Sequence, residues 1–262
     1  MKDLRDILKE FKRGEINEED IMKHLKIDYL EKVETSVLLD MPRMERTGFP
    51  EIVFAQSKEN DVLLKLITKY LKIRNFILIS RLREDQYPLL DEFIQKNPNY
   101  KLITNKLGKI AKIYHSSINS REFKGRIGLI TAGTSDIAIA EEIKMIAEAM
   151  ECEVITAYDV GIAGFHRIFE PLKMMIEKEV SVIVVAAGME GTLPGVVSAL
   201  VDIPVIGVPT SNGYGYGGKG EGALSTMLQS CSPGLSVVNI DNGVGAAASA
   251  ILIAKNANKE NK

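Results

Sequence analysis

The sequence has no tryptophan, only two cysteines and no excess of charge of either sign. Two cysteines far apart in the chain exclude a small disulfide-stabilised domain and are typical of a reducing compartment, which predicts a cytoplasmic location. The 33 basic residues balance 35 acidic ones, and the net charge of -2 gives no electrostatic case for nucleic acid. Apolar runs are of strand length, well short of the ~20 residues of a membrane span. We therefore expect no nucleic acid and no membrane partner.

Glycine is scarce in the first part of the chain, where residues 1–120 hold only three of the 21 glycines. The change in composition coincides with a polar run, HSSINSREFKG, that separates two apolar segments near Ser120. A chain of 262 residues is long enough to form two domains with separate cores. These features predict an N-terminal domain over residues 1–120 and a second domain over residues 121–262.

The N-terminal domain is predicted to be a small α/β domain. Apolar residues at helical spacing predict a first helix that Gly14 ends. Asn17, followed by three acidic residues, predicts the start of a second helix that runs to about Ile27. Short apolar runs (SVLLD, EIVF, FILIS, YKLIT and KIAKIY) then alternate with helical patterns at about residues 59–73 and 84–97.

The second half alternates more regularly between strand and helix patterns. Its short runs rich in valine and isoleucine are RIGLITAG, EVITAYDV, VSVIVVAAG, PVIGVPT and LSVVNID, and helical patterns follow them at about residues 134–150, 166–178, 192–200, 221–229 and 243–255. Strands that are almost continuously apolar are covered on both faces, and such alternation builds a doubly wound parallel sheet. We therefore predict a three-layer α/β/α domain with its ligand site at the carboxyl ends of the strands.

The loops assigned to those strand ends carry most of the unusual chemistry. They are TAGTSD (131–136), YDVGIAGFHR (158–167), AAGMEGTLPG (186–195), VPTSNGYGYGGKGEG (208–222), SCSPG (230–234) and IDNGVGA (240–246). In the first loop, Gly133 allows a tight turn, and Thr134, Ser135 and Asp136 open a helix whose unpaired amides suit a phosphate. The alternative is that Thr134 or Ser135 only caps the helix. Asp136 beside an anion suits ribose hydroxyls, so the loop predicts a nucleotide site.

A glycine-rich stretch from Pro209 to Gly222 holds six glycines together with Tyr214, Tyr216 and Lys219. It is too flexible to pack as a core element, and we interpret it as a mobile lid. The alternative is a crossover loop without a fixed structure, because glycine also makes linkers. In a lid, the tyrosines could stack on a heteroaromatic ring and Lys219 could neutralise a phosphate.

Three side chains in these loops are candidates for catalysis. Cys231, in the turn SCSPG, suits a nucleophile, although a lone cysteine also occurs as an inert small apolar residue. His166, in GFHR, suits acid–base or phosphate chemistry or a buried structural role. Glu190 is a carboxylate between glycines with no evident structural need for charge. Cys152, at the start of a predicted strand, is expected to be structural.

The order of the motifs TAGTSD, FHR, AAGMEGTLPG, PVIGVP and GLSVVNIDNGVGAAASA resembles the PurE family over about residues 127–255. PurE enzymes of the purine pathway move a carboxylate on aminoimidazole ribonucleotide. This chain differs from them in having Thr192 where they have a histidine in an AAHLPG-like loop, and in having Glu190 and Cys231. It also has an additional N-terminal domain with the segment PRMERTGFPEIVFAQSK (42–58). These departures resemble the LarB family, and that resemblance covers essentially the whole chain.

The LarB resemblance implies the first reaction of nickel-pincer nucleotide synthesis. LarB proteins carboxylate the pyridinium ring of nicotinic acid adenine dinucleotide, with carbon dioxide or bicarbonate as the carbon source, and split its phosphoanhydride. The products are AMP and pyridinium-3,5-biscarboxylic acid mononucleotide. A pyridinium ring is electron-poor and cannot attack carbon dioxide until a nucleophile adds to it. The resemblance therefore implies covalent catalysis by Cys231.

The same resemblance implies roles for the other candidates. Glu190 is the first choice, and His166 the second, for the base that removes the ring proton after carboxylation. Asp136 matches the nucleotide-binding aspartate of PurE. The residues expected to bind the substrate, its phosphates and its carboxyl group are Gly133, Thr134, Ser135, Asp136, Gly188, Thr192, Lys219, Asp241 and Asn242.

Magnesium and a homo-oligomer are also expected. Release of AMP requires charge on a pyrophosphate to be neutralised, and a divalent ion such as Mg²⁺ is the usual means. The sequence shows no dedicated cluster of ligands. Asp241 and Asn242 could contribute, or could instead start the final helix. PurE-fold proteins form octamers with sites shared between subunits, so the resemblance implies a homo-oligomer.

Two other functions remain open on the sequence alone. A PurE-type enzyme acting on aminoimidazole ribonucleotide would account for the phosphate loop and His166, but it leaves Cys231, Glu190 and the N-terminal domain unexplained. A non-catalytic nucleotide sensor would use the second half to bind AMP-like ligands and the first half to relay the signal. A sensor has no need of a nucleophile.

Overall fold

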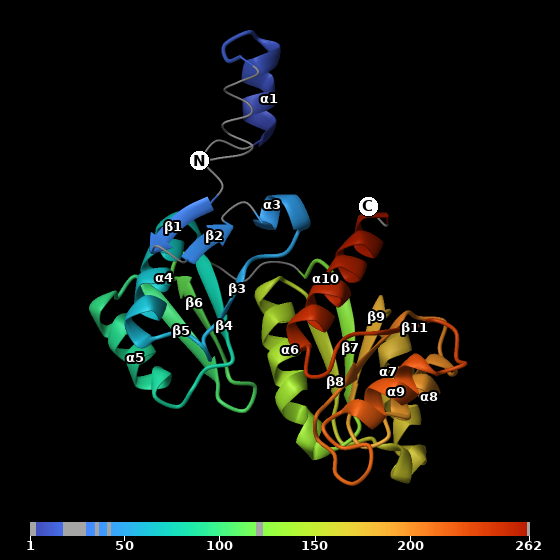
Figure 1. Cartoon of the computed structure of the whole chain (residues 1–262). Coiled ribbons are helices and arrows are strands. Elements are labelled where there is room, and N and C mark those ends of the chain that lie inside the picture. The colour runs from blue at the N-terminus through green and yellow to red at the C-terminus, as the bar shows by residue number, and fades with distance from the viewer. Residues whose placement is uncertain (1–3, 18–29, 35–36, 41–42, 119–122, 261–262) are drawn as a thin grey trace. The chain divides into compact units, whose positions relative to one another are not determined.

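The protein is described by a computed structural model that covers residues 4–17, 30–34, 37–40, 43–118 and 123–260 (Figure 1). Contacts within the chain divide it into two compact units, Met1–Glu51 with Glu59–Ile77, and Ile52–Lys58 with Leu78–Lys262. The predicted helix that follows Asn17 and the predicted domain boundary at residue 120 fall outside the described residues.

The first unit begins with the predicted amphipathic helix, α1 (Leu4–Lys12), and Gly14 follows it with a φ of +73°. A positive φ suits glycine because it has no Cβ to clash, which explains why the helix ends there. An antiparallel pair follows, β1 (Leu30–Glu34) and β2 (Val37–Asp40), and then α3 (Arg43–Thr47). The predicted helix over residues 59–73 is confirmed as α4 (Asn60–Ile73).

A mixed four-stranded sheet accounts for the other apolar runs of the N-terminal half. Its order is β3-β4-β6-β5, with β3 (Ile52–Phe54) parallel to β4 (Phe76–Ser80), and β5 (Tyr100–Asn105) antiparallel to β6 (Ile110–His115). The helix α5 (Gln86–Lys96) connects β4 to β5 and confirms the helical pattern predicted at residues 84–97. All of this sheet except the first residues of β4 belongs to the second unit.

The second half forms a five-stranded, fully parallel sheet with the order β8-β7-β9-β10-β11. Its strands are β7 (Arg126–Thr131), β8 (Glu153–Ala157), β9 (Val182–Ala187), β10 (Val205–Pro209) and β11 (Leu235–Val237). Every residue of β9 and β10 is buried, as the continuous apolar runs predicted. Burying each valine or isoleucine stabilises the fold by roughly 1.5–3 kcal/mol before the entropy of ordering is subtracted.

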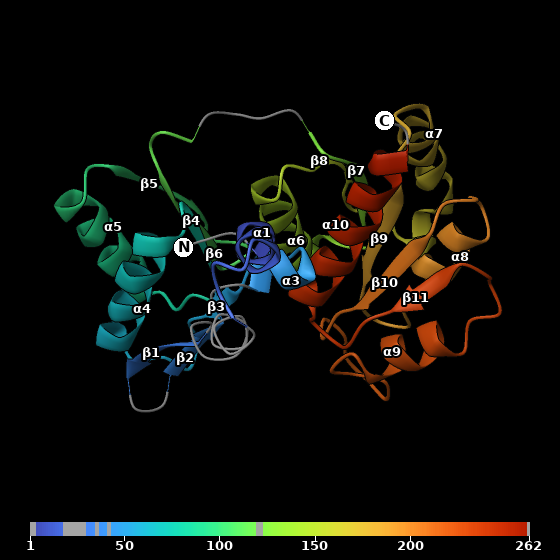
Figure 2. The ribbon, with the colours of Figure 1, turned by 90° about the horizontal axis from the view of Figure 1, so that it is seen from above.

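Helices cover both faces of this parallel sheet. One face carries α6 (Ile137–Ala149), which follows the short 3-10 turn η1 (Thr134–Asp136), and α10 (Gly243–Glu260). The other face carries α7 (Phe169–Glu177), α8 (Leu193–Ser198) and α9 (Glu221–Leu228), as Figure 2 shows. The predicted three-layer α/β/α domain, preceded by a smaller α/β domain, is confirmed. None of the described helices is long and apolar enough to cross a membrane.

Candidate functional site

The loops at the carboxyl ends of the parallel strands form the candidate site. β7 lies between β8 and β9, and the chain leaves β7 toward one face of the sheet and β9 toward the other. Such a reversal opens a crevice between the two loops, which is where doubly wound sheets bind ligands. TAGTSD follows β7 and AAGMEG follows β9. The strand-end positions predicted for these two loops are therefore confirmed.

The position predicted for SCSPG is wrong. Residues 230–234 connect α9 to β11, so they precede a strand and lie at the edge of the sheet where the strands begin. The sequence itself has this turn after the helical pattern at residues 221–229 and before the apolar run LSVVNID, so its order already placed it before a strand. The loop TAGTSD therefore follows a strand, whereas the turn of Cys231 precedes one.

Asp136 holds the loops after β7 and β10 together. Its carboxylate accepts hydrogen bonds from the Gly133 amide at 2.9 Å and from the Thr210 hydroxyl at 2.5 Å, and only 4% of the residue is exposed. The Asn212 side chain donates to the Ser135 carbonyl at 2.7 Å and to Asp136 at 3.4 Å. These hydrogen bonds of Asp136 fix the position of the loop. Thr134 and Ser135 lie exposed beside it.

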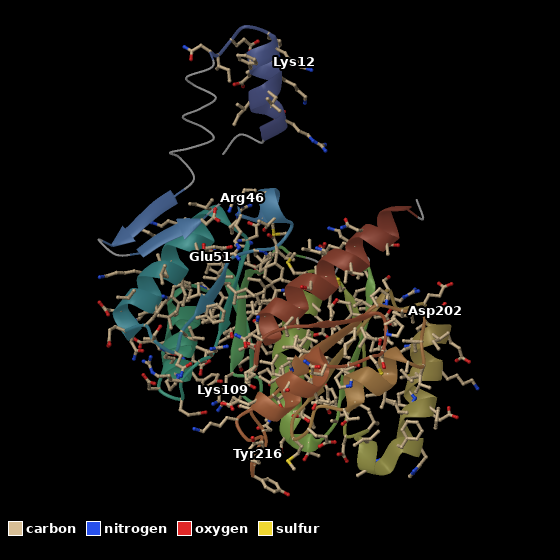
Figure 3. All side chains as sticks on the ribbon, turned by 45° about the vertical axis from the view of Figure 1, so that its right-hand side comes forward. Lys12, Arg46, Glu51, Lys109, Asp202 and Tyr216 are labelled. Carbon is tan, nitrogen blue, oxygen red and sulfur yellow. The ribbon has the colours of Figure 1, made fainter. Side chains whose placement is uncertain are left out.

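The glycine-rich stretch packs against the loop after β9 at its base and is exposed at its tip. The Met189 amide donates to the Asn212 carbonyl at 3.0 Å, and a Cβ on Gly191 would lie 2.7 Å from the Ala223 backbone. Tyr214 is 81% exposed, and Tyr216 is exposed completely. Figure 3 shows the side chain of Tyr216 pointing away from the rest of the molecule. Lys219 is exposed as well. Stacking by the tyrosines and charge neutralisation by Lys219 stay predictions.

Gly188→Ala is expected to destabilise the protein and disorder the loop that bears Glu190. A Cβ at Gly188 would overlap the Asn212 carbonyl oxygen, a backbone atom that cannot rotate away. Over-packing of this kind costs about 1–3 kcal/mol. Thermal unfolding measures the effect, with Gly213→Ala as the matched control, since its Cβ would lie 3.4 Å from the nearest atom. Equal melting temperatures for the two variants would contradict the expectation.

Cys231 and Thr192 line one groove between α8 and α9, with a volume of about 670 Å³. Gly191 and Thr192 come from the loop after β9, and Ser230, Cys231 and Ser232 come from the turn before β11. Cys231 is exposed, whereas Cys152 is fully buried and burial raises the pKa of its thiol to about 11. Of the two cysteines, Cys231 is the one that can meet a substrate.

Glu190 and His166 are exposed near this groove without lining it. Glu190 directly precedes Gly191, and His166 directly follows Phe165; both of those neighbours line the groove. His166 belongs to the 3-10 segment η2 (Ile162–Ile168), so the alternative of a buried structural histidine does not apply. The structure thus brings Cys231 and Thr192 together and leaves the two candidate bases on flanking loops.

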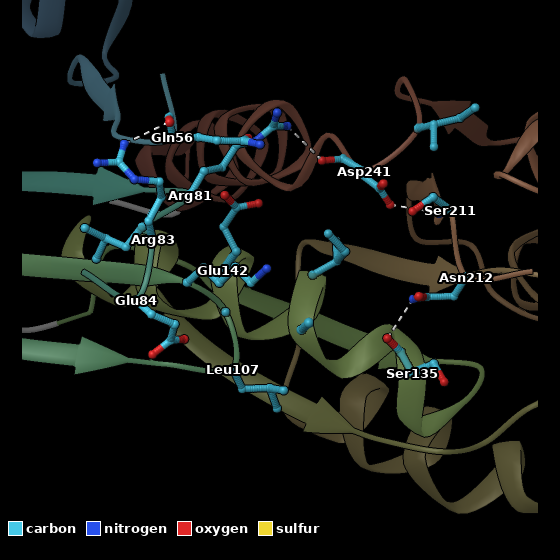
Figure 4. Close-up of a pocket in the computed structure, with 16 residues that line it drawn as sticks. Gln56, Arg81, Arg83, Glu84, Leu107, Ser135, Glu142, Ser211, Asn212 and Asp241 are labelled. Atoms are coloured by element: carbon cyan, nitrogen blue, oxygen red, sulfur yellow. Dashed lines mark hydrogen bonds between the residues drawn. The ribbon is translucent and has the colours of Figure 1, made fainter. Parts of the chain in front are cut away.

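A second cavity, of about 550 Å³, lies within the second unit and is shown in Figure 4. Two predicted residues, Ser135 and Asp241, line it, together with Arg81, Glu142 and Asn212, which the sequence analysis missed. Arg81 follows β4, so the strand-end argument applied to the N-terminal half would have found it. Glu142 lies inside α6, and no pattern in the sequence marks it.

Asn242 starts the final helix. Its side-chain oxygen accepts the Gly245 amide at 2.9 Å, and its carbonyl accepts the Ala246 amide at 3.1 Å. A role of Asn242 in binding stays a prediction. Asp241 accepts the Ser211 amide at 2.8 Å on one carboxylate oxygen. Within the part of the chain that the structure describes, no three histidine, cysteine or acidic residues are grouped to hold a metal ion.

Glu142 is a buried carboxyl group at the wall of the second cavity, with a hydrogen bond from the Ser80 hydroxyl. Burial raises the pKa of Glu142, against the opposing effects of the Ser80 bond and of Arg81. The folded protein therefore holds this proton more tightly than the unfolded chain. The resulting stabilisation is complete below the ordinary carboxyl pKa and is lost as the pH rises through the folded value.

Glu142→Gln is accordingly expected to flatten the dependence of stability on pH. The amide cannot ionise, so the variant should lose less unfolding free energy than the wild type between ~pH 4 and ~pH 8. Urea unfolding across that range is the measurement. Parallel pH profiles for the two proteins would show that Glu142 does not titrate as described.

Comparison with known proteins identifies the family to which this chain belongs. The AIR carboxylase model matches residues 126–262, and the LarB/PurE-like N-terminal domain model matches residues 31–114. The chain is a LarB-type member of the PurE-like family. This LarB-type chain is 48% identical to an uncharacterized protein of Methanocaldococcus jannaschii, over 97% of this chain and 98% of that protein.

Relatives with named activities match about half of the LarB-type chain. It is 31% identical to the N5-carboxyaminoimidazole ribonucleotide mutase of Pyrococcus horikoshii, over 53% of this chain and 72% of that protein. It is 32% identical to the mutase of the same name from Thermotoga maritima, over 50% of this chain and 70% of that protein. The family and these relatives support an enzyme with carboxylase-type activity.

Proposed function

We propose that this protein carboxylates the pyridinium ring of nicotinic acid adenine dinucleotide and hydrolyses its phosphoanhydride, giving pyridinium-3,5-biscarboxylic acid mononucleotide and AMP. The observation that carries the proposal is the combination of an exposed thiol, Cys231, with Thr192 in one groove of a LarB-type chain. A PurE mutase acting on aminoimidazole ribonucleotide needs no thiol, and its loop has a histidine where this chain has Thr192.

The chemistry begins with addition of the Cys231 thiolate to a ring carbon. The new carbon–sulfur bond uses the sulfur lone pair and discharges the ring cation, which leaves a dienamine with a nucleophilic 5-carbon. That carbon attacks carbon dioxide, supplied directly or from bicarbonate, and forms the new carbon–carbon bond. A base then removes the proton from the 5-carbon, the ring becomes aromatic again, and the electron pair of the carbon–sulfur bond returns to sulfur.

Two flanking residues are proposed for the proton transfer. Glu190 is the first choice because its carboxylate is exposed one residue before Gly191, which lines the groove of Cys231. His166 is the second, because it is exposed one residue after Phe165, on the other flank of the same groove.

Binding of the phosphoanhydride is assigned to the loop after β7. The hydroxyls of Thr134 and Ser135 are exposed at the start of η1, and free backbone amides at the beginning of a helical segment attract anions. Gly133 and Asp136 shape that loop through the bond between them. Since the described residues form no cluster of three acidic ligands, a magnesium ion here would be held mainly by substrate phosphates, with Asp241, which lines the same cavity as Ser135, as a candidate carboxylate.

A homo-oligomer, octameric by family resemblance, is part of the proposal. Cys231 lines the groove between α8 and α9, whereas Ser135 of the loop TAGTSD lines the separate cavity of Figure 4. If sites are shared between subunits, the thiol of one copy can serve the phosphate loop of another. Mixing two inactive variants, Cys231→Ser and Thr134→Val, should then restore part of the activity after subunit exchange, whereas unshared sites would give none.

One incubation separates this function from its alternatives. The protein is mixed with nicotinic acid adenine dinucleotide, ¹³C-bicarbonate and magnesium, and the products are identified by mass spectrometry. We expect AMP together with a mononucleotide that carries the ¹³C-carboxyl group. Turnover of N5-carboxyaminoimidazole ribonucleotide instead would indicate a PurE-type mutase. Binding of the dinucleotide without any product would indicate a nucleotide sensor.

A further inference from the structure

The cavity of Figure 4 extends beyond the loop TAGTSD and is lined by side chains of both charges, the basic Arg81, Arg83 and Lys109 and the acidic Glu84, Glu142 and Asp241. The side chains of Arg81 and Lys109 bring positive charge to it, and Ser135 connects it to that loop. Its volume of about 550 Å³ lies within the roughly 300–1,000 Å³ of small-molecule sites. The carboxyl group of Glu142 is buried at its wall, where it accepts a hydrogen bond from the Ser80 hydroxyl.

Three of the eight non-glycine residues with positive φ in the described part of the chain line this cavity. Arg81, Lys109 and Asp241 have φ values of +56°, +49° and +53°, and all three line it. Arginine and lysine rarely adopt positive φ, because their Cβ crowds the backbone where glycine would be free. Non-glycine residues with such strained backbone conformations occur at ligand-binding sites, where the contacts of the side chain with the ligand offset the strain.

Arg81 is held so that its guanidinium reaches across the cavity. It lies over the Phe54 ring at 5.3 Å and donates to the Asp241 carbonyl at 3.4 Å, a long bond that a stronger acceptor can replace. Arg83, in contrast, donates hydrogen bonds to Asp85 and to the carbonyls of Gln56 and Lys58, and it forms part of the cavity wall.

The floor of the cavity offers an apolar surface. Leu107 is 56% exposed there, and Ile139 and Ile240 line the same space. An exposed leucine beside arginine and lysine suits a ligand with one flat apolar part and one anionic part. A nucleoside monophosphate has both, since its base can lie on the leucine while its phosphate meets the cations.

We propose that this cavity binds the adenosine 5′-monophosphate half of the dinucleotide, the half that hydrolysis releases. Its phosphate is held by Arg81 and Ser135, and its base lies against Leu107. The inference rests on the proposed function for the identity of the ligand. It adds that recognition of the leaving half depends on Arg81, which follows β4 outside the parallel-sheet domain.

Arg81→Gly tests the proposal with little risk to the fold, because glycine suits a φ of +56°. AMP and adenosine are titrated separately into the wild type, Arg81→Gly and the control Arg126→Gln by isothermal calorimetry. Arg126 lies at the start of β7, at the other edge of the sheet. Loss of a charge-assisted phosphate bond should weaken AMP about 10- to 100-fold in Arg81→Gly and leave adenosine unchanged. Arg126→Gln should bind both as the wild type does.

The inference would be overturned by equal affinity of Arg81→Gly and wild type for AMP, or by turnover of the dinucleotide by a wild type that does not bind AMP. An equal loss of AMP and adenosine affinity would also count against it, because it indicates a collapsed cavity. Arg81-dependent binding of AMP without dinucleotide turnover would support this site while rejecting the proposed function. The AMP site and the proposed function can therefore be rejected independently of each other.

Discussion

Cys231→Ser is expected to abolish formation of the biscarboxylated mononucleotide while binding of the dinucleotide persists. A serine hydroxyl is a far weaker nucleophile than a thiolate at neutral pH, so the ring keeps its positive charge and cannot attack carbon dioxide. The substitution replaces one sulfur atom with oxygen in an exposed turn, so the packing of the core is unchanged. Product formation is followed by mass spectrometry and dinucleotide affinity by calorimetry.

Cys152→Ala is the matched control for this experiment. Cys152 is fully buried and its thiol pKa is raised to about 11, so it has neither the access nor the ionisation that the chemistry requires. The control should retain turnover even if it unfolds at a lower temperature, because a small cavity in the core affects stability and not the groove. Wild-type turnover by Cys231→Ser would remove the thiol from the mechanism.

Glu190→Gln is expected to lower turnover by about 10²–10⁴-fold, the usual contribution of a positioned base. The amide has nearly the same shape as the carboxylate but cannot take the proton from the 5-carbon. His166→Gln should have a much smaller effect if Glu190 is the base. Rates at saturating substrate and dinucleotide affinities are measured for both variants.

The two variants also decide between the candidate bases. A large loss in His166→Gln with a small loss in Glu190→Gln would reverse the assignment. In the Glu190 variant the thiol adduct should accumulate, because carboxylation precedes the missing proton transfer. An unchanged affinity for the dinucleotide in both variants would show that the loss lies in the chemical step.

Local sequence patterns predicted the parallel sheet because its strands are buried on both faces and must be apolar along their length. All six residues of β9 are apolar, so this strand can be recognised without reference to the rest of the chain. The same patterns predicted the strand-end loops around Gly133 and Gly188, since glycine marks tight turns and close approach of backbones.

The parts that were missed depend on contacts between distant segments. The bond from Thr210 to Asp136 joins positions 74 residues apart, and no local pattern announces it. Glu142 meets Ser80 from the middle of a helix, where a glutamate is otherwise an ordinary exposed residue. The turn of Cys231 is a different case, because the order of the helical pattern at residues 221–229 and the run LSVVNID already places it before a strand.

The most direct test of the central claim is a search for the covalent intermediate. The wild type and Glu190→Gln are mixed with nicotinic acid adenine dinucleotide and bicarbonate, quenched with acid, digested and analysed by peptide mass spectrometry. The account predicts a pyridine-nucleotide adduct on the peptide that contains Cys231, none on the peptide that contains Cys152, and more adduct in Glu190→Gln. Continued turnover with no modified Cys231 peptide at any quench time would contradict it.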